Sequence, residues 1–100
     1  MITLPVQIDQ TFSNIIQLNP KDYGIRKKLD IFIAINKVDE QTLILHIVQK
    51  SRFLQKDVDK IEEIVTLLNI ETQNKIILIE SPLCSKAKAK LENNNWSVLI

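Results

Sequence analysis

The chain has 100 residues, 45% of them hydrophobic and 25% charged, and its formal net charge is +1. This composition excludes a disordered chain and predicts a single globular domain over residues 1–100. A near-neutral charge is also weaker than the basic bias of a dedicated nucleic-acid binder. The chain has one cysteine, no signal-peptide pattern and no apolar run near the roughly 18 residues that span a membrane, so we expect a cytoplasmic protein without a membrane partner.

The first predicted element is a short helix near the N-terminus. Asp9 is a suitable N-cap, and Phe12, Ile15 and Ile16 follow at helical spacing. Pro20 should end this helix, because the residue before a proline is driven out of the helical conformation. The chain contains a single glycine, which excludes a glycine-rich phosphate-binding loop.

A β-hairpin is predicted next. Residues 29–36, LDIFIAIN, and residues 42–49, TLILHIVQ, are rich in β-branched residues and flank the turn KVDEQ. Both strands are almost continuously apolar, so both faces should be covered by other parts of the protein. The hairpin is therefore expected in the middle of an α/β sheet.

The second half alternates helices and strands. A helix over residues 55–69 is predicted from one apolar stripe, and a strand follows at residues 76–80. Ser81 and Pro82 are typical of a helix start, and the last strand should cover residues 96–100. The predicted order is α-β-β-α-β-α-β, a mixed four-stranded sheet with helices on both faces.

Two groups of polar residues are candidates for binding an anion or nucleic acid. The first follows the hairpin, and the second lies at the end of strand 76–80, where ligands of such sheets tend to bind and where a helix start offers free N–H groups. The candidates are Lys50, Arg52, Lys56, Ser81, Ser85 and Lys86. The alternatives are a solvated surface for the lysines and a plainly capped helix for the serines.

Cys84 and His46 have both structural and chemical interpretations. Cys84 lies near a helix start and beside a lysine, which would lower the pKa of a thiol, but a lone cysteine is more often a small core residue. His46 lies within an apolar strand, and we favour a packed histidine that is hydrogen-bonded to a neighbour over a catalytic base. With one histidine and one cysteine, the sequence excludes a zinc site.

The order of elements resembles the common core of the restriction-endonuclease-like, PD-(D/E)xK superfamily, especially its Mrr-like and Holliday-junction-resolvase-like branch. Asp30 opens one strand, Gln49 and Lys50 close the next, a helix follows, and the segment IILIESPLCSKAKAKLENNNWSVLI completes the pattern. The resemblance implies a restriction-endonuclease-like core over roughly residues 10–100. It also implies a nuclease that holds Mg²⁺ with carboxylates beside a lysine.

The residues of this chain depart from that catalytic pattern. Val48 stands two residues before Lys50, where the motif requires aspartate, glutamate or at least glutamine, and strand alternation directs Gln49 to the other face. No glutamate precedes Glu40, so the acid of the family's first helix is also missing. Asp30 alone cannot hold catalytic Mg²⁺, and it has a structural alternative, an ion pair with Lys28 or Lys50.

The sequence therefore predicts a non-catalytic accessory or interaction module with a degenerate nuclease-like fold, no metal and no cofactor. Its partner would be a protein, a second copy of the chain, or nucleic acid contacted through the basic residues. One alternative is a metal-dependent nuclease with a displaced ligand set that uses Asp30 and Lys50. Another is a structural subunit of a larger assembly, with Phe53, Leu54 and Trp96 as an apolar contact patch unless they close the ends of the core.

Overall fold

The computed structural model describes residues 4, 5, 8 and 11–100. Five strands, two α-helices and one 3-10 helix at Pro20–Tyr23 are present in this part of the chain. In chain order the strands and α-helices are β1 Ser13–Leu18, β2 Asp30–Ile35, β3 Gln41–Val48, α1 Gln55–Leu68, β4 Asn74–Glu80, α2 Ser85–Asn93 and β5 Trp96–Leu99.

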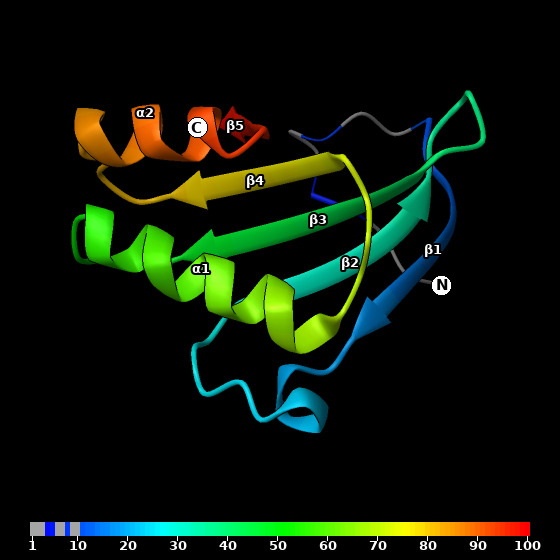
Figure 1. Ribbon diagram of the computed structural model, residues 1–100, viewed down its shortest axis with the longest axis horizontal. Helices are drawn as coiled ribbons and strands as arrows, with labels where there is room; N and C mark the ends of the chain where they lie inside the picture. The colour runs from blue at the N-terminus through cyan, green and yellow to red at the C-terminus, as the bar shows by residue number, and fades with distance from the viewer. Residues whose placement is uncertain (1–3, 6–7, 9–10) are drawn as a thin grey trace.

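The five strands form one mixed sheet in the order β1-β2-β3-β4-β5 (Figure 1). β1 pairs with β2 and β2 with β3 in antiparallel fashion, whereas β3, β4 and β5 are parallel neighbours. The predicted α/β fold is confirmed, but the sheet has five strands instead of four. The element order is β-β-β-α-β-α-β.

The predicted first helix is wrong, because its apolar residues lie at the edge of the sheet. Ile16 pairs with Ile33 and Leu18 with Ile31, which gives these residues backbone partners that a short helix would lack. A register shift between Ser13 and Ile16 marks an irregularity where Asn14 has φ 51°. Asp9, the predicted cap, lies outside the described residues.

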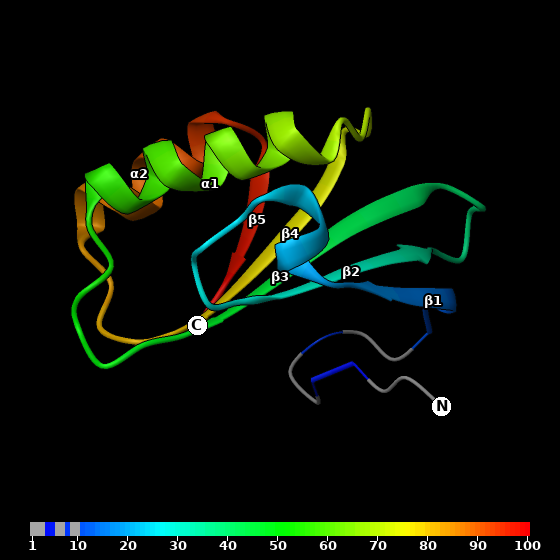
Figure 2. The ribbon, with the colours of Figure 1, turned by 90° about the horizontal axis from the view of Figure 1, so that it is seen from below.

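Both α-helices cover the same face of the sheet, which corrects the predicted arrangement with helices on both faces (Figure 2). The connections from β3 through α1 to β4 and from β4 through α2 to β5 step across the sheet in the same direction. Because such crossovers share one hand, two steps in the same direction place their helices on the same face. No helix in the described chain is long and apolar enough to cross a membrane.

The sheet separates two hydrophobic cores. Under the helices, Leu43, Leu45 and Ile47 of β3 are fully buried. On the other face, Ile44 of β3 packs in a smaller cluster, which the N-terminal residues Leu4 and Ile8 join. The strands of the hairpin are therefore covered on both faces, as their continuous hydrophobicity predicts.

The second α-helix begins later than predicted. Ser81 and Pro82 lie in the loop after β4, and Cys84 is the N-cap of α2. Instead of starting a helix, the loop after β4 forms a parallel β-bridge: its Leu83 pairs with Phe53 in the loop before α1. This bridge determines the geometry of the candidate site described next.

Candidate functional site

Two loops are joined at the edge of the sheet where β3 and β4 end. The Phe53 backbone N–H donates to the Pro82 carbonyl oxygen, with 2.8 Å between N and O, and the Cys84 N–H donates to the Phe53 carbonyl oxygen at 3.0 Å. Phe53 is completely buried beneath this contact. The β3–α1 and β4–α2 loops are therefore held side by side by backbone bonds and by a large apolar anchor.

The bridged loops bring two helix starts to the same edge. The N-termini of α1 and α2 both lie where β3 and β4 end, and the two helices run alongside each other from there (Figure 1). A helix start carries free N–H groups and the positive end of the helix dipole. At the start of α1 the Asp57 carboxylate already accepts a hydrogen bond from the Leu54 N–H, with 2.8 Å between N and Oδ2, whereas the first turn of α2 has no acidic residue. The start of α2 is therefore the one that suits an external anion.

The six residues predicted to bind an anion or nucleic acid all lie in or next to these two loops. Five of them are exposed, and Ser81 is partly buried. Ser81 donates a hydrogen bond from its hydroxyl to the adjacent Pro82 carbonyl, with 3.3 Å between the oxygens. The structure thus brings together residues from two distant parts of the sequence: Lys50, Arg52, Lys56, Ser81, Ser85 and Lys86.

The pKa of the Cys84 thiol is lowered by the positive groups at this edge. The backbone N–H groups of Ala87 and Lys86 lower the pKa of the Cys84 thiol below its usual value, and the charges of Arg52 and Lys86 lower it further, against an opposing effect of burial. Arg52 and Lys86 belong to different loops, so both loops act on the same point. Cys84 is half-buried and packs against the helix-side core, as its apolar interpretation predicts.

A second polar cluster lies on the helix-free face at the same edge. His46 approaches Glu80 of β4 with Nε2 2.5 Å from Oε2, and its Nδ1 lies 3.6 Å from Oδ2 of Asp30 in β2. The His46 side chain is 14% exposed, whereas those of Asp30 and Glu80 are 52% and 42% exposed. The prediction of a packed histidine that is hydrogen-bonded to a neighbour is confirmed.

This cluster is poorly arranged to hold a metal ion. The two carboxylates come from β2 and β4, strands separated by roughly 10 Å because β3 runs between them. The imidazole fills the space between the carboxylates and turns a different ring nitrogen to each. Consistent with this arrangement, the described residues contain no group of three or more histidine, cysteine or acidic side chains suited to a metal.

The predicted departures from the nuclease pattern have structural counterparts. The Val48 side chain lies on the same face of β3 as His46 and is 59% exposed, so an apolar group stands beside the cluster. Gln49 lies on the other side and accepts a hydrogen bond from Lys27, with 3.3 Å between Nζ and Oε1. Asp30 faces His46 and has no ion pair with Lys28 or Lys50 within the described structure.

Glu80 is the site residue that sequence reasoning missed. It is the last residue of a strand that is otherwise apolar from Ile76 onward, and it pairs in register with Val48. A charged residue that ends a buried strand is a usable signal. Its place beside His46 follows only from the parallel register of β3 and β4.

The apolar patch predicted for an assembly contact is largely internal. Phe53 is fully buried and Trp96 is 4% exposed, and the Trp96 indole donates to Glu62 with 3.1 Å between Nε1 and Oε1. Leu54 is 36% exposed. Two of the three residues therefore close the core, which was the alternative interpretation.

Comparison with known proteins gives no identification. No protein-family model, curated protein sequence or solved structure matches this chain.

Proposed function

We propose that this chain is a non-catalytic interaction module on a degenerate nuclease-like core, and that it contacts nucleic acid through the two bridged loops. The proposal depends mainly on the bridge between Phe53 and Leu83, which gathers the predicted basic residues and the start of α2 at one edge. Phosphate groups bind to such combinations of lysine or arginine side chains and helix N-termini. Because the overall charge is only +1, the contact would have to be confined to this region.

The non-catalytic part of the proposal is supported by the arrangement of the acidic residues. A magnesium-dependent nuclease needs carboxylates that converge on the ion and the scissile phosphate. Here His46 stands between Asp30 and Glu80, and Val48 lies beside them. From the predicted hairpin onward, the order of strands and helices still agrees with the nuclease-like core that the sequence resembles.

The test is binding of a fluorescent 20-base-pair DNA duplex measured at a series of salt concentrations. Each phosphate contact that is lost should lower the slope of log affinity against log salt by about 0.9. The double variant Arg52→Gln/Lys86→Gln should therefore lower the slope by about 1.8. A charge-matched control, Lys21→Gln/Lys37→Gln, alters exposed lysines in the 3-10 helix and the β2–β3 turn and should retain the original slope.

Two results would contradict the nucleic-acid proposal. One is the absence of detectable binding at about 50 mM salt, where phosphate contacts are strong. The other is an equal loss of slope in the control, which would show that net charge matters and the bridged loops do not.

A second candidate function is a metal-dependent nuclease with a displaced ligand set. The observation that favours it is that Asp30 and Glu80 reach the same imidazole at the edge where Lys50 follows β3. Incubation of a supercoiled plasmid with Mg²⁺ separates the two functions. Cleavage that is lost in Asp30→Ala would establish the nuclease and refute the non-catalytic module.

A further inference from the structure

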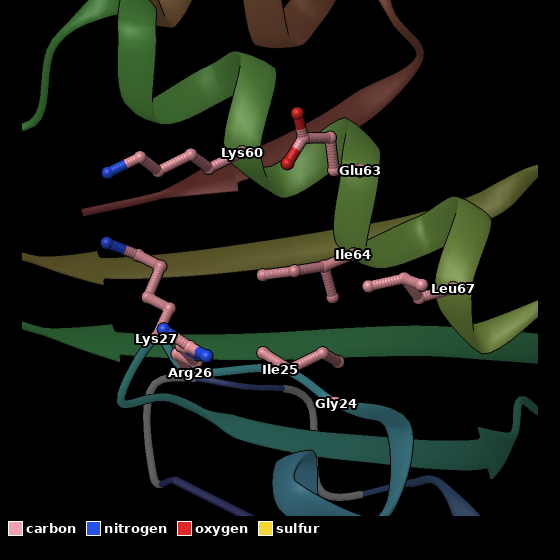
Figure 3. A pocket seen from close by; sticks show the side chains of 8 residues that line it. All are labelled: Gly24, Ile25, Arg26, Lys27, Lys60, Glu63, Ile64 and Leu67. Carbon is pink, nitrogen blue, oxygen red and sulfur yellow. The ribbon is translucent and has the colours of Figure 1, made fainter.

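An open groove lies between residues 24–27 and one side of α1 (Figure 3). None of the six residues predicted to bind an anion or nucleic acid lines it. Its volume is about 410 Å³, within the range of small-molecule sites. On the helix side, the groove is lined by Lys60, Ile64 and Leu67. Because residues three or four positions apart lie on the same face of a helix, these side chains form one wall. This stretch of helix extends about 10 Å, which sets the length of the groove.

The floor of the groove is apolar. Ile25 and Ile64 are buried, at 6% and 4% exposure, while the Leu67 side chain remains 54% exposed on the helix wall. A half-exposed leucine next to two buried isoleucines presents apolar surface that a ligand could remove from water. The floor therefore favours a hydrocarbon body of modest length.

Positive groups from opposite walls converge at one end of the groove. Lys27 and Lys60 extend their ammonium groups toward the same end, Lys27 from the loop and Lys60 from α1 (Figure 3). Lys27 uses one donor for Gln49, which leaves two others for a ligand. Lys60 and the nearby Arg26 have no ion pair or hydrogen-bond partner in the described structure.

Glu63 is the one acidic residue in the lining, so the three cations leave a net charge of +2. The arrangement is amphipathic, with a cationic end and an apolar floor. A ligand with the complementary arrangement carries one anionic group and one apolar chain.

We propose that this groove binds a medium-chain alkyl carboxylate, with the carboxylate between Lys27 and Lys60 and the chain along Ile25, Ile64 and Leu67. A carboxylate matches the ammonium donors by charge-assisted hydrogen bonds. A straight chain matches the length and apolar character of the floor. None of these residues belongs to the proposed nucleic-acid site, so the two proposals can fail independently.

Octanoate is the probe for the test, and the methyl signals of Ile25, Ile64 and Leu67 in ¹³C-labelled protein are the readout. We expect saturable shifts confined to these methyls and their neighbours. Octanoate should bind roughly 4- to 15-fold more tightly than hexanoate, the upper value applying if both extra methylenes are fully buried. Acetate and octyltrimethylammonium, which lack the chain and the negative charge respectively, should bind much more weakly.

Four exposed positions make the test specific to the groove. Lys60→Gln should weaken octanoate binding by about fivefold, and Leu67→Asn should weaken it by removing apolar surface from the helix wall. Glu63→Gln should strengthen it, because a repelling charge is lost. Lys37→Gln, in the β2–β3 turn, is the matched control and should bind octanoate as the original chain does.

The proposal is overturned if octyltrimethylammonium shifts the same methyls as strongly as octanoate, since charge recognition would then be absent. It is also overturned if Lys60→Gln and Lys37→Gln have the same effect, or if octanoate produces no saturable shift in the folded protein.

Discussion

The two faces of the sheet are built from alternate residues of the same strands, yet they have different compositions. On the helix face of β3, Leu43, Leu45 and Ile47 remain apolar to the end of the strand. On the other face, Ile44 is followed by His46 and then by exposed Val48. One face of β3 is therefore buried and apolar to the end of the strand, while the other carries a polar side chain, His46, and then an exposed apolar one, Val48.

The difference follows from what covers each face. Two helices, fixed by crossovers and by the bridge between Phe53 and Leu83, lie over the helix face. Leu4 and Ile8, neither of which lies in a helix or strand, cover part of the other face. Within the part of the chain that the structure describes, no α-helix lies over this face, and partly exposed acidic side chains stand at its edge.

The largest expected effect comes from truncating the helix-side core. Leu45→Ala should destabilise the protein by about 3 kcal/mol, because a rigid pair of helices cannot close the cavity. Leu4→Ala, also nearly fully buried, should cost less, because Leu4 packs in the smaller of the two clusters. Urea unfolding of both variants checks the comparison, and an equal or larger loss for Leu4→Ala would contradict it.

The polar cluster should contribute less than either core. His46→Ala should destabilise the protein by about 1.5 kcal/mol through lost packing and the lost bond to Glu80. A double-mutant cycle should give about 0.5 kcal/mol of coupling between His46 and Glu80, which is partly exposed, and less between His46 and Asp30, which is 3.6 Å away. A stronger coupling to Asp30 would show that the cluster is organised differently.

Thr42 offers a stabilising change on the helix-free face. Its hydroxyl oxygen is buried and has no hydrogen-bond partner among the described residues. Thr42→Val preserves the shape and removes the unsatisfied group, so the free energy of unfolding should rise by about 1 kcal/mol. Thermal and urea unfolding measure this, with Thr66→Val on the exposed side of α1 as a comparison that should show no such gain. A loss of stability in Thr42→Val would indicate that the hydroxyl is solvated.

The smallest expected effect is on the rate at which Cys84, at the edge where β3 and β4 end, is alkylated. Because the pKa of Cys84 is lowered, its thiolate forms at lower pH than in an ordinary cysteine, so alkylation should reach its half-maximal rate at lower pH than in the urea-unfolded chain. Arg52→Gln should move this midpoint upward with little effect on stability, because a nearby positive charge is lost. The rate of iodoacetamide labelling against pH measures it, and Lys37→Gln should leave the midpoint unchanged. A folded-state midpoint above that of the unfolded chain would contradict the assignment.

Local sequence predicts the elements whose signals are local. The hairpin and α1 agree with their predicted ranges to within one or two residues, because continuous apolar runs and one helical stripe are strong signals. The segment around Ile15 and Ile16 was misassigned because its apolar spacing fits a helix as well as a strand. Pairing with β2, which is not visible in the segment itself, decides between them.

The site could be predicted only in part for the same reason. The basic residues are evident from the sequence, but their convergence depends on the bridge between two loops 30 positions apart, Phe53 and Leu83. Similarly, Asp30, His46 and Glu80 become neighbours through strand register. Ser81 and Pro82 have the residue types of a helix start, yet tertiary pairing delays α2 to Ser85.

The bridge between the loops also has a dynamic consequence. The amide hydrogens of Phe53 and Cys84 belong to irregular segments, but each is donated across the junction. Neither crossover can open without breaking bonds to the other, so these two amides should exchange with deuterium as slowly as those of β3 and β4 and not at the rate of ordinary loops. The starts of the two helices would then open together, as one cooperative unit.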